Sequence, residues 1–323
     1  MKGTVMADPA TRDIDVLCAG LAVADVMAKA VDELPAWDHL GTFDHIEHHI
    51  GGCAVNTAVD LVKLGSRVAV SACIANDAAG QFIRRRLETQ GLEVSALVET
   101  DKASSSYTFV MIGSDGRRRY LHHVGANAHF ADTDVPDDML VRARILHVGG
   151  TFLMPALDGE PTARLLKRAK RFGVTTSMDT AFNVNVDCAA LIDPCLPHLD
   201  IFIPSIEEAQ AITGRQEPDT ILEWFADKPV PILGVKLGNE GCVLRADGTV
   251  QRYPAFRVNV VDGSGAGDAF MAGFLYGVLH GWDLGKAARF ANATAAHCIQ
   301  AIGCSTGIPP AEQVRRFMST WAP

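Results

Sequence analysis

Short apolar runs rich in β-branched residues alternate with segments whose apolar residues recur at helical spacing along most of the chain. This alternation predicts parallel strands joined by helices, because a parallel pair of strands needs a long crossover connection. The runs are apolar throughout, which favours a sheet covered by helices on both faces. We therefore expect a three-layer α/β fold with a mostly parallel sheet. Its strands are expected at residues 16–21, 68–74, 145–148, 174–178, 201–203 and 232–235.

The helical segments between these strands each end at a glycine. Glycine adopts the left-handed backbone conformation that commonly ends a helix, so these positions are expected helix ends. The predicted helices 54–64, 81–90, 162–172 and 207–213 end at Gly65, Gly91, Gly173 and Gly214.

Two stretches break the alternation. Residues 28–50 and 104–124, the second with a turn at Asp115-Gly116, have the pattern of β-ribbons. A third ribbon is expected as a hairpin at 243–253, around Asp247-Gly248, and the rest of the C-terminal part is expected to be helical.

Polar side chains stand where two of the predicted strands end, at Asp179 and Ser205. Open α/β sheets bind ligands at the carboxyl ends of their strands, so we expect both residues to face a common ligand-binding crevice.

The segment Asp262-Gly263-Ser264-Gly265-Ala266-Gly267-Asp268 precedes a run of small and apolar residues. Its glycines leave backbone N–H groups uncovered at the start of a helix, where the helix dipole also favours negative charge. Asp268 adds a carboxylate beside those donors, and we also expect it to cap the helix. The pattern indicates a phosphate-binding loop that contains a base.

The two common nucleotide-binding motifs do not fit this segment. The P-loop requires a Lys-Ser/Thr pair after its last glycine, and none follows Gly267. The dinucleotide motif belongs after the first strand, whereas this loop lies late in the chain. The first observation argues against a P-loop, and the second argues against an NAD-dependent oxidoreductase.

Composition excludes several classes of function. The formal net charge of −9 argues against binding to nucleic acid or to an anionic membrane, and no apolar run is long enough to span a bilayer. The eight cysteines are scattered without a close pair, so we expect buried thiols of a reducing compartment, the cytoplasm. Residues 1–12 are expected to form a loose tail.

The loop at 262–268 resembles the second signature of the PfkB (ribokinase-like) family of carbohydrate and nucleoside kinases. The run Gly51-Gly52-Cys53-Ala54-Val55-Asn56-Thr57-Ala58 is similar to its first signature, and the resemblance continues through most of the chain. It implies one Rossmann-like kinase domain at 13–323, with the ribbons near 28–50 and 104–124 forming a β-sheet lid. The implied reaction transfers the γ-phosphate of ATP to a sugar hydroxyl with Mg²⁺. It also implies a homodimer paired through the lid.

The resemblance assigns catalytic and substrate-binding roles. Asp268 is the expected base, and the N–H groups of Gly265, Ala266 and Gly267 are expected to stabilise the transferred phosphoryl group. The expected sugar-binding residues are Asp25, Gly51, Gly52, Asn56 and Asn127, although Asn127 suits a structural turn equally well.

The resemblance also assigns nucleotide and cation sites. Glu208 is expected to hold Mg²⁺ through water. The expected nucleotide-binding residues are Lys236, Gly238, Gly241, Ser264, Asn292 and Ala295. A K⁺ ion is expected beside backbone oxygens of Asp262, Ser264, Ile299, Gly303 and Gly307.

The sequence departs from the family pattern at Gly263, where a threonine is usual, and at Ser205, where an asparagine is usual. These departures leave two alternatives to a sugar kinase: a nucleoside kinase of the same fold, and a sugar-binding regulator with weakened catalysis. Arg117 and Arg119 would share one face of the lid ribbon, where they could meet an anionic substrate. We expect instead that these charges discourage edge pairing, and that the substrate is a neutral sugar.

Overall fold

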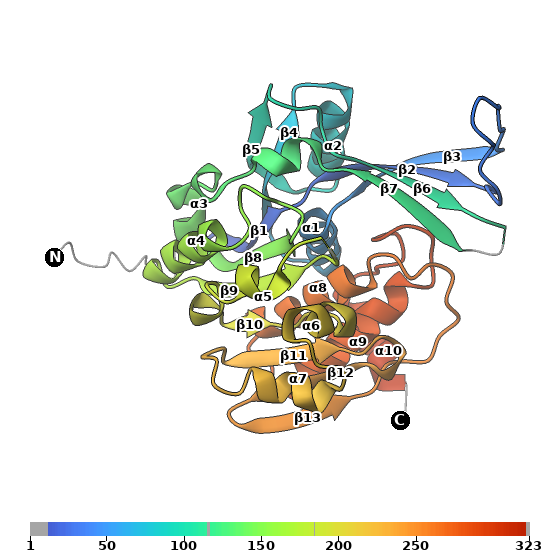
Figure 1. Ribbon diagram of the computed structural model, residues 1–323. Coiled ribbons are helices and arrows are strands. Elements are labelled where there is room, and N and C mark those ends of the chain that lie inside the picture. The colour runs from blue at the N-terminus through green and yellow to red at the C-terminus, as the bar shows by residue number, and fades with distance from the viewer. Residues whose placement is uncertain (1–11, 115–116, 184, 321–323) are drawn as a thin grey trace.

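The computed structural model describes residues 12–114, 117–183 and 185–320. They form a large sheet with helices on both faces and a smaller sheet that projects from one end (Figure 1). The large sheet has the strand order β13-β12-β11-β10-β9-β8-β1-β4-β5. Its strands from β11 through β5 in this order pair in parallel, and β12 and β13 add an antiparallel hairpin.

The elements of the body have the following bounds. The strands are β1 (Ile14–Gly20), β4 (Val68–Ala75), β5 (Glu93–Thr100), β8 (Ala143–Thr151), β9 (Thr175–Thr180), β10 (Ile201–Phe202), β11 (Ile232–Lys236), β12 (Cys242–Ala246) and β13 (Thr249–Tyr253). The helices are α1 (Cys53–Leu64), α2 (Ala78–Thr89), α3 (Asp137–Arg142), α4 (Glu160–Arg171), α5 (Cys188–Ile192), α6 (Ile206–Thr213), α7 (Pro218–Trp224), α8 (Ala266–Leu279), α9 (Leu284–Cys298) and α10 (Ala311–Thr320). Short 3₁₀ helices occupy Gly125–His129, Asp132–Asp134, Leu196–His198 and Gly238–Glu240.

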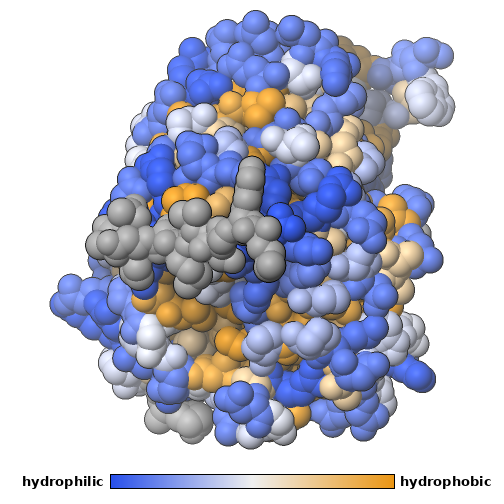
Figure 2. Space-filling model, turned by 90° about the vertical axis from the view of Figure 1, so that its left-hand side faces the viewer, coloured by the Kyte–Doolittle hydropathy of each residue, from blue (hydrophilic) through white to orange (hydrophobic). Residues whose placement is uncertain are grey.

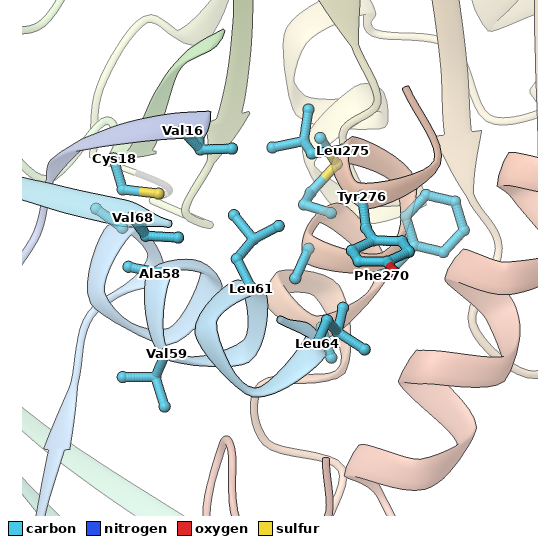
Figure 3. Packing of buried hydrophobic residues seen from close by; sticks show 14 of the residues in the cluster. Val16, Cys18, Ala58, Val59, Leu61, Leu64, Val68, Phe270, Leu275 and Tyr276 are labelled. Atoms are coloured by element: carbon cyan, nitrogen blue, oxygen red, sulfur yellow. The ribbon is translucent and has the colours of Figure 1, made fainter. Parts of the chain in front are cut away.

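Strand alternation divides the core between the two faces of the sheet. Val16 and Cys18 of β1 belong to one buried cluster with α1, α2, α8, α9 and α10, whereas Leu17 and Ala19 belong to the other with α3 to α7. Figure 3 shows Leu61 pointing from α1 toward α8, and this side chain is fully buried. Burying a leucine contributes about 1.5–3 kcal/mol, so this contact fixes α1 and α8 side by side.

The smaller sheet is the lid. It has the order β3-β2-β6-β7 and consists of β2 (Val23–Lys29), β3 (His45–Gly51), β6 (Tyr107–Ile112) and β7 (Arg118–His123). In Figure 1 its strands extend away from the body, and β7 is the strand nearest the C-terminal loops. The lid therefore faces the ends of α1 and α8.

The predicted architecture is confirmed, with three corrections. The first lid strand begins at Val23, before the expected segment 28–50, because the chain leaves the main sheet and enters the lid without turn residues between β1 and β2. Residues 30–44 of that segment contain no strand. The sequence analysis missed β5, an edge strand whose exposed charged residues hide its apolar pattern. The expected turn at Asp115-Gly116 lies outside the described residues.

The face that carries α3 and α4 is mostly hydrophilic, with apolar side chains scattered between the polar ones (Figure 2). Within the described residues, no helix combines the length and the apolar character needed to cross a membrane.

Candidate active site

The predicted phosphate-binding loop, residues 262–268, leads into α8 through a left-handed glycine. Gly265 precedes the helix with φ of 76°, and a Cβ at this position would lie 2.4 Å from the carbonyl oxygen of Cys304. Only glycine combines this conformation with so close an approach. The N–H groups of Ala266, Gly267 and Asp268 open the helix and have no partner within it, because the first turn of a helix leaves its donors free.

Asp268 lies in the first turn of α8 as its third residue. The helix is preceded by Gly265 and has no side-chain cap, so the prediction that Asp268 caps it is wrong. The carboxylate is turned sideways instead, and its Oδ2 accepts a 2.8 Å hydrogen bond from Nδ2 of Asn56 on α1. The Thr57 hydroxyl also lies 3.4 Å from the Asp268 carbonyl oxygen. The packing of α1 against α8 thus fixes the direction of the carboxylate.

The surroundings of Asp268 raise the pKa of its carboxyl to about 7. Burial is the main cause, and the negative charge of Asp179 acts in the same direction, while the Asn56 hydrogen bond and the Lys236 charge oppose both. A carboxylate with such a pKa is a stronger base than an exposed aspartate, and it can accept and release a proton near neutral pH.

Lys236, at the end of β11, brings a positive charge to the phosphate-binding loop. Its Nζ lies 2.9 and 2.8 Å from the two carboxylate oxygens of Asp179 at the end of β9. The same Nζ would be 3.3 Å from a Cβ at Gly267, so the ammonium group lies against the loop. Both side chains are nearly buried, and the pair places a fixed cation beside the helix N-terminus.

Glu208 lies on the same side of the crevice, in the first turn of α6. Its Oε2 accepts a 2.7 Å hydrogen bond from the Ser205 N–H, and the Ser205 hydroxyl accepts one from the Glu208 N–H. This reciprocal pair is a capping box, so serine in place of the family's asparagine preserves the start of the helix. Burial raises the pKa of Glu208, the positive charge of Lys236 lowers it, and the carboxylate of Asp179 raises it.

The lid contributes Asp25, which lies within β2 rather than at a strand end. A Cβ at Gly51 would come within 2.0 Å of the Asp25 carboxylate, and Gly52 has φ of 98° at the start of α1. Gly51 therefore leaves room for the Asp25 carboxylate, and Gly52 leaves room for the Leu21 carbonyl oxygen, which a Cβ there would approach to 2.4 Å. Burial raises the pKa of Asp25 to about 6, against the effects of the Thr108 hydroxyl and the positive charge of His49.

Asn127 is fully buried next to the start of the lid. Its Oδ1 accepts a hydrogen bond from the Ala22 N–H at 3.2 Å, and its Nδ2 donates to the Ala22 carbonyl at 3.1 Å. These two bonds hold the backbone at the point where the chain passes from β1 to β2. The contacts favour the structural interpretation of Asn127.

A crevice of about 780 Å³ runs from the phosphate-binding loop along the ends of β9 and β11. A second hollow of about 690 Å³ continues it between α9 and the loop at 255–260. Gly238 and Ala295 line both. Gly241 has φ of 94°, and a Cβ there would lie 2.1 Å from the Tyr253 carbonyl oxygen, so glycine lets the two loops meet.

Asn292 also lines both hollows, but its amide holds the protein backbone. Its Nδ2 donates to the carbonyl oxygens of Tyr253 and Pro254 at 3.0 and 3.2 Å. These bonds position the loop that forms one wall of the second hollow.

Asp262 ties together the segments in which a cation site was expected. Its carboxylate accepts hydrogen bonds from the N–H groups of Ser264 and Gly303, at 2.7 and 2.8 Å, and its own N–H donates to the Ile299 carbonyl at 3.1 Å. Gly307 packs close to the carbonyl oxygen of His297. Burial would raise the pKa of Asp262, but these hydrogen bonds and the guanidinium of Arg118 hold it below its usual value.

Two contacts at the site were not predicted from the sequence. Asp179 was expected at the crevice, and the end of an apolar strand signals it, but nothing in the sequence pairs it with Lys236. Arg118 contacts the Asp262 carboxylate and the Ser264 hydroxyl from the lid. It is one of three consecutive arginines, and only the tertiary structure selects it.

Comparisons with known proteins agree with this geometry. The chain is 26% identical to a nucleoside kinase of Methanothermobacter thermautotrophicus over 96% of this chain and 98% of the relative. It is 26% identical to a 5-dehydro-2-deoxygluconokinase of Geobacillus thermodenitrificans over 95% and 94%, respectively. These relatives have different named substrates, so they do not identify the acceptor of this chain.

Among solved structures, an Arabidopsis thaliana ribokinase with ribose and ATP matches with a TM-score of 0.81 at 23% identity, over 94% of this chain and 98% of that one. A putative ribokinase II from E. coli with ATP and Mg²⁺ matches with a TM-score of 0.81 at 20% identity, over 95% and 100%. At these identities the likeness establishes the ribokinase-like fold. The family model for pfkB family carbohydrate kinases matches residues 13–311, and the chain belongs to this family of ATP-dependent sugar kinases.

Proposed function

We propose that this protein transfers the γ-phosphoryl group of ATP to a hydroxyl of a small neutral sugar. The observation that carries the proposal is the buried Asp268 carboxylate, held by Asn56 beside the open N-terminus of α8. This arrangement offers a base for the hydroxyl proton and backbone donors for the phosphoryl group within one helical turn.

The nucleotide end of the proposed site is the crevice between Lys236 and α9. Lys236 supplies positive charge for the phosphates, and Gly238, Gly241 and Ala295 line the space beside it. In this proposal the second hollow holds the adenine of ATP, and Asn292 acts by holding the loop that forms one of its walls.

Magnesium fits the carboxylates on the same side of the crevice. Glu208 and Asp179 line it together, and carboxylate oxygens are suitable Mg²⁺ ligands. We propose that Glu208 holds the ion through water, because one of its oxygens already accepts the Ser205 N–H. When bound, the ion would neutralise the charge of the polyphosphate.

The sugar end of the proposed site lies between the lid and the start of α1. The Oδ1 of Asn56 is buried and has no hydrogen-bond partner among the described residues, so it can accept a bond from a sugar hydroxyl. Asp25 and Asp268 are both acceptors at this end when ionised. A substrate with a carboxylate would meet two like charges here, and this supports a neutral acceptor.

A substrate panel read out by ADP release tests the proposal. It contains neutral aldoses and ketoses, keto-sugar acids such as the substrate class named for the Geobacillus relative, and purine ribosides. We expect a neutral sugar to have the highest kcat/KM. A higher kcat/KM for a sugar acid or a nucleoside would overturn the assignment of a neutral sugar as the acceptor. Tight sugar binding without ADP release would indicate a sugar-binding regulator.

Replacing Asp268 by asparagine should remove most turnover, because the amide keeps the shape but cannot accept a proton. The loss of a general base typically lowers kcat by about a hundredfold to ten-thousandfold. In the native enzyme, kcat/KM for the sugar should rise with pH through about 7, as Asp268 ionises. Steady-state kinetics between pH 5.5 and 8.5 measure both effects.

The same variant offers a control for folding. The folded-state pKa of Asp268 lies above the unfolded value, so its contribution to stability is present at low pH and is lost as pH rises through about 7. D268N should therefore gain thermal stability relative to the native protein at pH 8 more than at pH 5.5. A near-normal kcat in D268N would overturn the assigned mechanism.

Asp25→Asn should weaken sugar binding while leaving the KM for ATP nearly unchanged. A lost hydrogen bond to a charged group costs about 1.5–3 kcal/mol, so the sugar KM should rise about tenfold or more. Asn56→Ala should lower kcat as well, because Asn56 also orients Asp268. Asp138→Asn, on exposed α3, is the matched control. Equal losses for both substrates would indicate that Asp25 serves folding.

We also propose a K⁺ site formed by backbone oxygens of Asp262, Ser264, Ile299, Gly303 and Gly307. Its support is that hydrogen bonds join three of these segments around the Asp262 carboxylate. A cation there would orient the loop's N–H groups and add positive potential. Activity should be higher in K⁺ than in tetramethylammonium at equal ionic strength, and equal rates would exclude the site.

A homodimer paired through the lid is a further part of the proposal. Large apolar side chains on the lid and its 30–44 loop are exposed, including Trp37 at 95%, Leu40 at 91% and Leu121 at 63%. Leu121 also lines an apolar hollow of about 670 Å³ together with Phe43 and Phe109, a surface that a second lid would cover. Sedimentation velocity should detect a dimer that L121E weakens and V250E, on exposed β13, does not. A native monomer at micromolar concentration would exclude it.

We propose the cytoplasm as the location. All eight cysteines are free and six are buried, which suits a reducing compartment.

A further inference from the structure

Arg118 connects the lid to the phosphate-binding loop across the mouth of the site. From the start of β7 its guanidinium pairs with the Asp262 carboxylate and donates to the Ser264 hydroxyl. The side chain of Arg118 is 13% exposed and that of Asp262 is fully buried. This contact differs from a surface ion pair, because one partner is removed from water and is held by other groups.

The position of Asp262 links this contact to the phosphate-binding loop. Its carboxylate also accepts the N–H groups of Ser264 and Gly303, so a single side chain joins the lid, the phosphate-binding loop and the segment after α9. Ser264 immediately precedes Gly265, the left-handed residue that starts α8. A shift at Asp262 or Ser264 therefore changes the direction of the N–H groups that follow.

The lid register places Arg118 on the face that the site requires. Arg118 lies opposite Ile112, and Tyr120 opposite Val110, so the two share one face of β7. Tyr120 lines the crevice together with Gly265 and Asp268. Arg119 points to the opposite face and is exposed. Of Arg118 and Arg119, the strand therefore directs only Arg118 toward the phosphate-binding loop.

We propose that Arg118 is a positioning residue that couples closure of the lid over the sugar to the conformation of the phosphate-binding loop. Asp25 on β2 and Arg118 on β7 belong to one sheet, so a lid that opens to admit the sugar also withdraws the guanidinium from Asp262, and closure restores the contact. The loop then has its catalytic conformation only while the lid is closed. This suppresses transfer of the phosphoryl group to water while the lid is open, because an open lid leaves the Ser264 hydroxyl without the Arg118 guanidinium.

Kinetics of matched variants test this coupling. This kinetic test rests on the proposed kinase function. Arg118→Met should lower kcat/KM for the best sugar of the panel about tenfold or more, with a lower kcat. The Kd for Mg·ADP, measured by calorimetry without sugar, should stay within about twofold, because Arg118 lines neither hollow of the proposed nucleotide site. Arg118→Lys should recover part of the loss, since it keeps the charge without the planar fork. Arg119→Met is the control and should match the native enzyme.

Hydrogen exchange tests the contact without any substrate. Amides of residues 262–266 should exchange faster in Arg118→Met than in the native protein or in Arg119→Met, while α4 should be unchanged. Unchanged loop exchange, or native kcat/KM in Arg118→Met, would overturn the proposal. Equal losses in the Arg118→Met and Arg119→Met variants would also overturn it. If the native protein phosphorylates no sugar, the proposed function fails, and the exchange arm still decides whether the lid holds the loop.

Discussion

The hydrogen bond between Asn56 and Asp268 is the interaction on which the site depends. It joins residues 212 positions apart and crosses the contact between α1 and α8, the helices that begin with the two glycine-rich signatures. Burying the Asp268 carboxylate is unfavourable unless a donor compensates it, and Asn56 supplies that donor. The packing of apolar residues such as Leu61 between these helices holds the two ends in register (Figure 3). The hydrophobic core therefore determines the geometry of the Asp268 carboxylate, the proposed base.

Charge at the site is balanced within a small volume. Asp179, Glu208 and Asp268 place three carboxylates around Lys236, which is paired with Asp179. Their mutual repulsion and their burial raise the pKa values of Asp268 and Glu208, and Lys236 opposes both shifts. Such a cluster is costly for folding, and clusters of perturbed carboxylates are typical of sites that bind metal ions and phosphates. The cluster therefore lowers the stability of the folded protein at the ends of the strands, where the backbone geometry brings these groups together.

Much of the fold follows from local patterns. The parallel strands were predicted because each is an apolar run between helical segments, and the helix ends because glycine marks them. The prediction failed where local patterns compete. The passage from β1 to β2 contains no turn residue, since Asn127 rather than a local turn holds Ala22. The edge strand β5 was missed because its polar residues Glu93, Ser95 and Glu99 interrupt the apolar pattern. The expected cap at Asp268 was wrong because Asn56 draws the carboxylate away from the helix end.

The sequence alone determined the α/β class and the family, because these depend on residue types at short, regular spacing, and it predicted a phosphate-binding loop on the same ground. Glycine at 265 allows a left-handed backbone, and Asp268 places a carboxylate near a helix start, wherever the loop lies in the fold. The tertiary structure decided the partners: Asn56 for Asp268, Asp179 for Lys236, and Arg118 rather than its arginine neighbours for Asp262. These pairs join segments that are distant in the chain. Their choice depends on strand register and helix packing, which the core as a whole sets and no short stretch of sequence encodes.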